Sequence, residues 1–184
     1  MPEIASPSAS TLTPAKTARQ RTDTFTSIWM MIAVAMAIAA LVAKSRMPQP
    51  LWTMIHLVTL GVLSNGIFQW SWFFARSLAR LSADDPRARR HNTIRVLIFN
   101  AFFASLFVSM WLGWMVGTVI AATGIAAVAA WHGAEMLSVL RERLASRFVV
   151  VVRYYVCSAS FFVLAALLAS FVSATMFSPS IPEA

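Results

Sequence analysis

The sequence predicts an all-α integral membrane protein: a bundle of five transmembrane helices with its N-terminus inside the cell and its C-terminus outside. Three observations lead to this prediction. Hydrophobic residues make up 59% of the 184 residues and charged residues only 12%, whereas about a quarter of the residues in a soluble domain are charged. Long stretches of the chain contain no charged residue. The basic residues gather on one side of the predicted membrane.

The stretches without Asp, Glu, Lys or Arg set the number of helices. A helix needs about 20 apolar residues to cross the hydrocarbon core of a bilayer. The stretches 24–43, 47–75 and 154–182 each accommodate one span, and the stretch 96–134 accommodates two. Gly113 and Gly117, with tryptophans beside them, mark the turn between these two spans. We therefore predict helices at 25–43, 51–75, 96–114, 117–139 and 149–177.

The two ends of the chain fall outside this transmembrane domain of residues 25–177. Residues 1–24 are rich in Ser, Thr, Pro and Ala and show no hydrophobic periodicity. Such a composition is typical of a disordered segment, here a cytoplasmic tail. Residues 178–184 are predicted to form a short external tail.

The orientation follows from the basic residues. With the N-terminus inside, 13 of the 15 basic residues fall on the cytoplasmic side, and only Lys44 and Arg46 fall outside. Basic residues in short loops are retained in the cytoplasm, so this asymmetry predicts the topology and a location in the plasma or inner membrane. Because these residues are dispersed as loop anchors, the net charge of +8 does not indicate a nucleic-acid partner. The predicted partner is the lipid bilayer.

Polar groups inside the predicted spans are the candidate functional residues, because burying them in lipid is costly. The second span carries His56 near its outer end and Asn65 and Gln69 further in. The histidine either binds a metal or pairs with a hydroxyl group. For the two amides we favour hydrogen bonds between helices.

The fourth and fifth spans carry the remaining candidates. His132 lies near the inner end of the fourth span, and Glu135 follows one turn later. The carboxylate either orients the imidazole, as in metal sites, or forms an interfacial pair with it in headgroup water. Arg153 and Tyr154 begin the fifth span, where the arginine either extends to the lipid headgroups or contacts an anionic group such as a haem propionate or a lipid phosphate.

His56 and His132 are the candidate metal ligands, and their depths differ. At 1.5 Å per helical residue the two lie about 15 Å apart across the membrane. One haem cannot bind both of them, so a haem on this chain needs a second ligand from another subunit, or two separate half-sites. The single cysteine, Cys157, excludes an internal disulfide and a metal site with several cysteines.

Three segments carry a resemblance to a known family; they are 56–61 with 67–74, 131–132 with 140–141, and 147–148 with 152–156. In order and spacing they resemble the membrane-spanning N-terminal region of actinobacterial copper-oxidase and nitrite-reductase-like proteins, over residues 50–177. The resemblance implies a membrane redox module tied to copper or nitrogen-oxide chemistry, with His56 and His132 holding haem or copper. The chain departs from that family because it has no cupredoxin domain and only five predicted helices.

The sequence therefore predicts a membrane module or accessory subunit of a copper, haem, nitrogen-oxide or respiratory redox system. Other membrane subunits or a second copy of the chain are the expected protein partners. The alternative is a structural or assembly protein without a cofactor, whose polar residues only join helices. A small transporter is less favoured, because the sequence shows neither a pair of broken helices nor an acidic residue at the bilayer midplane. No catalytic nucleophile or acid–base pair indicates an enzyme.

Overall fold

The computed structural model describes residues 14–47, 49–81, 90–143 and 149–176, and the regular structure of these residues is entirely helical. Five helices are long and apolar enough to cross a membrane, at Thr24–Val42, Pro50–Leu78, Asn92–Trp111, Met115–Arg141 and Val149–Thr175. Their bounds agree with the predicted spans to within four residues. The prediction of an all-α, multi-pass membrane protein is confirmed. Its orientation and the identity of the membrane stay predictions.

Helix α1 covers Pro14–Val42 and begins earlier than its predicted membrane span. Residues 14–24 are therefore helical, and not part of a disordered tail as predicted. Proline is well tolerated in the first turn of a helix, and the Ala, Lys, Arg and Gln residues that follow favour helix formation. The remainder of the predicted N-terminal tail and the predicted external tail at 178–184 lie outside the described residues.

The second span is a continuous helix with an irregular centre. It consists of α2 (Pro50–His56), the π-helical segment η2 (Leu57–Ser64) and α3 (Asn65–Leu78). Two side chains bond to backbone oxygens that lie five residues earlier in this segment: Ser64 Oγ donates to Thr59 at 2.8 Å and Asn65 Nδ2 donates to Leu60 at 3.3 Å. The π-helical segment is wound more widely than an α-helix. The two side chains donate hydrogen bonds to its backbone oxygens.

The last three helices form an antiparallel group: α4 (Asn92–Trp111), α5 (Met115–Arg143) and α6 (Val149–Met176). The turn predicted at Gly113 is confirmed. This residue has a φ of +64°, a conformation that glycine adopts without the steric penalty of a side chain. Gly117 lies in the first turn of α5, not in the connection itself.

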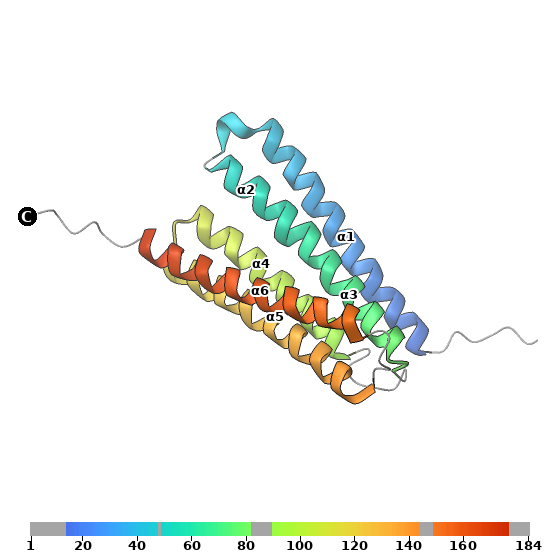
Figure 1. Cartoon of the computed structure of the whole chain (residues 1–184). Helices are drawn as coiled ribbons and strands as arrows, with labels where there is room; N and C mark the ends of the chain where they lie inside the picture. Colours follow the sequence, from blue (N-terminus) through green and yellow to red (C-terminus); the bar gives the residue numbers. More distant parts are fainter. Residues whose placement is uncertain (1–13, 48, 82–89, 144–148, 177–184) are drawn as a thin grey trace, which may run out of the picture.

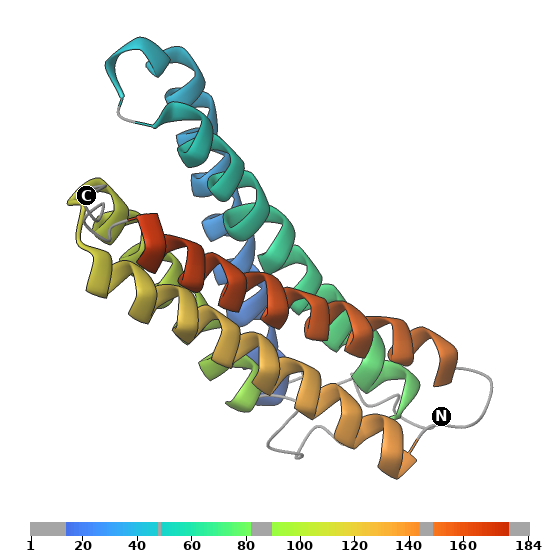
Figure 2. The same cartoon turned by 60° about the vertical axis from the view of Figure 1, so that its left-hand side comes forward.

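The helices fall into two groups that meet along η2 and α3 (Figures 1 and 2). Helix α1 packs against η2, while α5 packs against both α4 and α6. We call the end of the bundle where α1, α4 and α6 begin the first end, and the opposite end the second end (Figure 1). Two apolar clusters fill the interior, one around Phe99 and Ile125 and one around Trp72 and Met136. The second cluster borders the candidate functional site.

The predicted orientation is testable with reporters. A reporter fused after Ala184 should lie outside the cell, and one inserted in the loop 80–92 should lie in the cytoplasm. The expectation follows from the 13 basic residues on one side of the five spans. Activity of both reporters on the same side of the membrane would contradict the five-span topology.

Candidate functional site

Polar side chains gather where α3, α4 and α5 meet, in the half of the bundle nearer the first end. This is unusual in a chain surrounded by lipid, because each buried polar group needs a partner inside the protein. The group is made up of Ser71 from α3, Asn92 and Arg95 from α4, and His132 and Glu135 from α5, all of them buried.

His132 is held by a serine from a neighbouring helix. Its Nε2 atom lies 2.9 Å from Ser71 Oγ, and its ring lies 4.6 Å from that of Phe68, measured between centroids. The other nitrogen, Nδ1, is buried without a hydrogen-bond partner among the described residues. We assign the hydroxyl as the donor to Nε2, which leaves the proton of the neutral ring on Nδ1. The opposite tautomer would leave two groups unpaired, the hydroxyl hydrogen and the Nδ1 lone pair, instead of one.

A pocket of about 120 Å³ adjoins this histidine. It lies between α3, α5 and α6, and its walls include Ser64, Phe68, Ser71, His132, Tyr155 and Phe162. Ile67 and Ser158, which also line the pocket, are exposed on the outer surface of the bundle. The pocket is therefore open sideways, toward the region that lipid occupies around a membrane-spanning bundle.

Arg95 is fully buried, although it stands at the edge of a charged loop in the sequence. The guanidinium carbon lies 4.9 Å from the centre of the Trp72 ring, a cation–π contact. Nη2 donates to Asn92 Oδ1 at 3.0 Å, whereas Nε and Nη1 have no partner among the described residues. The sequence had placed this arginine among the cytoplasmic loop anchors. The structure corrects that interpretation, because Arg95 contributes charge to the interior.

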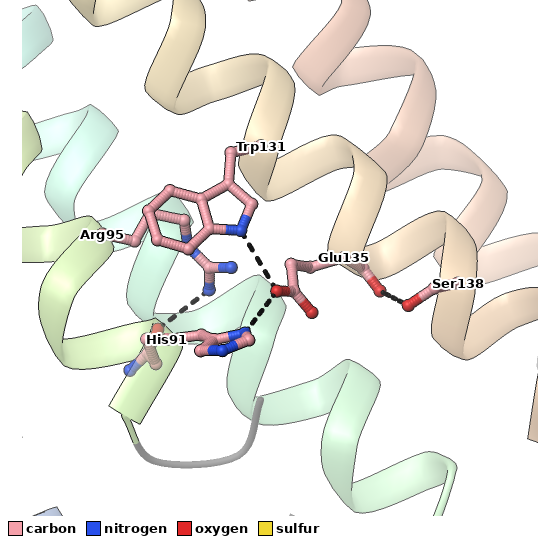
Figure 3. A network of polar contacts seen from close by, with 6 residues as sticks. His91, Arg95, Trp131, Glu135 and Ser138 are labelled. Carbon is pink, nitrogen blue, oxygen red and sulfur yellow. Dashed lines mark hydrogen bonds and ion pairs between the residues drawn. The ribbon is translucent and has the colours of Figure 1, made fainter. Parts of the chain in front are cut away.

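Glu135 is the only carboxylate among the side chains that the structure describes. His91 Nδ1 donates to its Oε1 atom at 2.8 Å, and Trp131 Nε1 donates to the same oxygen at 3.1 Å (Figure 3). The guanidinium of Arg95 lies beside this group (Figure 3). The carboxylate thus connects a partly exposed histidine at the start of α4 with the buried arginine.

The pair expected between Glu135 and His132 does not form. Glu135 follows His132 by three residues in α5, so its carboxylate lies one turn nearer the first end. There His91 and Trp131 supply its hydrogen bonds. Ser71 takes the orienting role that the sequence had suggested for Glu135. Sequence reasoning missed Ser71 and His91, because both partners come from helices far away along the chain.

A second polar contact lies deeper in the bundle. The side-chain amides of Asn65 in α3 and Asn100 in α4 exchange two hydrogen bonds, each 2.9 Å long. Each amide nitrogen also donates to a backbone oxygen of its own helix, Gly61 at 3.1 Å and Val96 at 2.9 Å. Gln69, the other amide singled out in the sequence, lies partly buried one turn further along α3.

Replacing Asn65 or Asn100 with Leu should each lower the free energy of unfolding in detergent by about 0.6–2 kcal/mol, because the remaining amide loses its partner. The double substitution should cost less than the sum of the two, since no amide is then left unpaired. Ser105→Ala on α4 is the matched control, because that exposed hydroxyl bonds only to its own helix. Strictly additive costs in an unfolding titration would contradict the pairing.

His56 lies at the junction of α2 and η2, toward the second end. Its Nδ1 atom lies 2.8 Å from the backbone oxygen of Trp52, and the two rings stack with centroids 4.1 Å apart. Because a carbonyl oxygen only accepts, Nδ1 carries the proton and the Nε2 lone pair is available. Nε2 has no hydrogen-bond partner among the described residues.

The two candidate metal ligands lie far apart. Ser71, which contacts His132, follows His56 by fifteen residues in the same helical span. At 1.5 Å per residue the two histidines are separated by about 20 Å. No group of three His, Cys, Asp or Glu side chains converges as a metal site within the described part of the chain.

The remaining candidates lie on the outside of the bundle. Arg153 and Tyr154 are both exposed near the start of α6, where an arginine side chain reaches the headgroup region of a bilayer. Cys157 is exposed as a free thiol on the same helix.

Comparisons of the chain with protein-family models, with curated proteins and with solved structures found no match.

Proposed function

We propose that this multi-pass membrane protein is a module of a redox system and that it offers His56 as a ligand to haem or copper. The observation that carries the proposal is the hydrogen bond from Nδ1 of His56 to the Trp52 carbonyl. Histidines that bind metals usually donate their second N–H to a backbone carbonyl or a carboxylate, which fixes the tautomer and points the free nitrogen toward the metal. His56 meets this condition.

His132 fits a metal less well than His56. Its Nε2 atom accepts from Ser71, and in the assigned tautomer its Nδ1 atom carries the proton, so neither nitrogen offers a lone pair. The other polar groups around it are hydroxyls of serine and tyrosine, whereas redox copper sites use imidazole and sulfur ligands. The proposed metal chemistry therefore rests on His56 alone.

A single histidine holds a haem or copper only together with further ligands. His56 belongs to no group of three His, Cys, Asp or Glu side chains within the described residues, and we propose that a partner membrane subunit or a second copy of this chain supplies the second ligand. His56 suits such a shared site, because it is partly exposed and its neighbours Ile55 and Val58 face outward. When bound, the metal group would supply electron transfer, and this chain would fix the position and basicity of one ligand.

The test is a reduced-minus-oxidised absorption spectrum, with metal analysis, of the full chain purified in mild detergent together with its native partners. His56→Ala and His56→Gln should both lose the signal. Thr59→Ala should keep the signal, because the Thr59 hydroxyl bonds to the backbone oxygen of Ile55 in its own helix. A spectrum without haem bands and a preparation without copper would defeat the proposal.

That outcome would leave the structural alternative, which predicts a different pattern for the same variants. In a structural protein His56→Gln should be nearly silent, because glutamine also donates to a carbonyl. His56→Ala alone should then lower the free energy of unfolding, by about 0.6–2 kcal/mol, the range measured for hydrogen bonds inside membranes.

A further inference from the structure

Helices α5 and α6 run antiparallel and side by side, and both reach the first end of the bundle (Figures 1 and 2). They approach closely at Gly133, where a Cβ atom would lie 3.2 Å from Cβ of Ala159. From this contact toward the first end, Arg141 follows after eight residues of α5 and Arg153 after six residues of α6. At 1.5 Å per residue the two arginines lie about 12 Å and about 9 Å beyond the contact. They therefore stand at nearly the same height on neighbouring helices.

Both arginines lie on the side of this helix pair that faces away from α3. His132 of α5 and Phe162 of α6 contact side chains of α3. Each arginine is nine residues from the α3-contacting residue of its own helix, which is about two and a half turns. Each therefore lies on the opposite side of its helix, where both arginines are exposed. Because neighbouring helix axes are about 8–10 Å apart, the two guanidinium groups share one face of the pair.

No carboxylate neutralises these two arginines within the described part of the chain. Glu135, the only carboxylate among the described side chains, is buried and accepts hydrogen bonds from His91 and Trp131. Two exposed cations on one face attract an anion, and a guanidinium group matches the oxygens of a phosphate in geometry as well as in charge. The face therefore offers the charge and the donors of a phosphate site.

The same face continues toward the second end without a charged residue. Seven and eleven residues correspond to about two and three helical turns, so the positions in line with the arginines are Ala130 and Ala134 in α5 and Ser160 and Leu164 in α6. All four are exposed. The hydroxyl of Ser160 donates to the backbone of its own helix, so it does not make the face more polar. This surface is suited to acyl chains, and the alanines leave room for them.

We propose that Arg141 and Arg153 together bind the phosphate of one anionic phospholipid, whose acyl chains lie against α5 and α6. A soluble phosphate fits less well, because the lipid-facing surface continues from the arginines toward the centre of the bilayer. The first end is also the predicted cytoplasmic side, where anionic lipids attract basic residues. The site is separate from the proposed metal ligand, because His56 lies at the junction of α2 and η2, toward the second end.

The test is a titration of the full chain, purified in mild detergent, with phosphatidylglycerol, and native mass spectrometry counts the bound lipids. One phosphatidylglycerol per chain should bind more tightly than phosphatidylcholine, because the choline headgroup carries its own cation. Arg141→Gln and Arg153→Gln should each weaken phosphatidylglycerol binding about fivefold, the loss expected for one basic residue near the lipid surface. The double variant should lose less than the product of the two, because both arginines hold the same phosphate.

Arg90→Gln is the matched control. Arg90 is exposed two residues before α4, so its substitution removes the same charge at the same end, outside the face shared by α5 and α6. Phosphatidylglycerol binding should stay nearly unchanged, whereas a loss equal to that of Arg141→Gln would show a general attraction between charges and overturn the inference. Equal binding of the two lipids, fully multiplicative losses in the double variant, or displacement of the lipid by an equal concentration of glycerol 1-phosphate would overturn it as well.

Discussion

Replacing Glu135 with Gln should lower the free energy of unfolding by about 3 kcal/mol. Removing one member of a buried ion pair in direct contact costs about 3–5 kcal/mol, because an uncompensated charge stays in the interior. The lower limit applies here, because the hydrogen bonds of Glu135 go to His91 and Trp131, while Arg95 only lies beside it (Figure 3). Glutamine keeps an oxygen for the two donors, while it removes the charge and replaces the other oxygen with an NH2 group.

Arg95 makes this effect large. It is fully buried, and Glu135 is the only carboxylate among the described side chains. Its cation–π contact with Trp72 contributes about 2 kcal/mol in a desolvated setting, which is less than the cost of burying an uncompensated charge. In Glu135→Gln the guanidinium therefore loses its anionic neighbour without gaining a substitute.

A double-substitution cycle isolates the interaction. Arg95→Met alone should be destabilising, because it leaves the carboxylate without its cationic neighbour. In the Glu135→Gln background the same substitution should be much milder, because it removes the remaining charge and two N–H groups that lack partners. We expect a coupling free energy of about 0.5–3 kcal/mol, the range for residues that share one network.

Arg141→Met provides the matched control for this cycle. Arg141 lies on the same helix as Glu135 but is exposed, and charges in contact with solvent contribute little. Its substitution should add to Glu135→Gln without coupling. The measurement is an SDS titration of each variant from mild detergent, followed by circular dichroism. Equal coupling for Arg95 and Arg141 would show that Glu135 acts through overall charge and not through the buried network.

The spans were predictable because a bilayer imposes a simple requirement on the sequence. About 20 consecutive apolar residues are needed for each crossing, whatever the neighbouring helices do. The turn at Gly113 was predictable for a similarly local reason, since its positive φ favours glycine. The early start of α1 at Pro14 was missed, because a polar, Ser- and Thr-rich composition obscured a run of good helix formers.

The candidate site was only partly predictable, because it depends on which helices become neighbours. His132 was recognisable as an intramembrane histidine, but its partner Ser71 is separated from it by 61 positions in the chain. Arg95 had the sequence context of a loop anchor, and only the packing of α4 against Trp72 buries it. Asn100 is likewise defined by a contact across helices, with Asn65. Hydropathy carries no information on such pairings.

Gly61→Ala should lower the free energy of unfolding by about 1–3 kcal/mol, the usual cost of forcing an extra methyl group into a packed interior. A Cβ atom at this position would lie 2.6 Å from Cβ of Ala33 in α1 and 3.3 Å from the ring of Phe103 in α4. The Cβ of Ala33 is attached directly to the backbone of α1, so it cannot turn aside as the end of a long side chain can. The whole of α1 must therefore move away from η2.

Gly66→Ala is the matched control for this substitution. It lies in the same helical span, but its Cβ would meet only the terminal methyl group of Met30, at an ordinary distance of 3.6 Å. Because alanine is favoured over glycine in a helix by about 1 kcal/mol, Gly66→Ala should be neutral or stabilising. Only Gly61→Ala should thus lower the midpoint of an SDS titration, although the chemical change is the same.

A compensating substitution tests whether the contact with Ala33 is the cause. Ala33→Gly in the Gly61→Ala background moves the methyl group from one helix to the other and restores the close approach of α1 and η2. The double variant should recover most of the lost stability, because the helix-propensity cost of glycine at position 33 is offset by the gain of alanine at position 61. Equal midpoints for Gly61→Ala and Gly66→Ala, or no recovery in the double variant, would contradict the packing of α1 against η2 on which this half of the bundle depends.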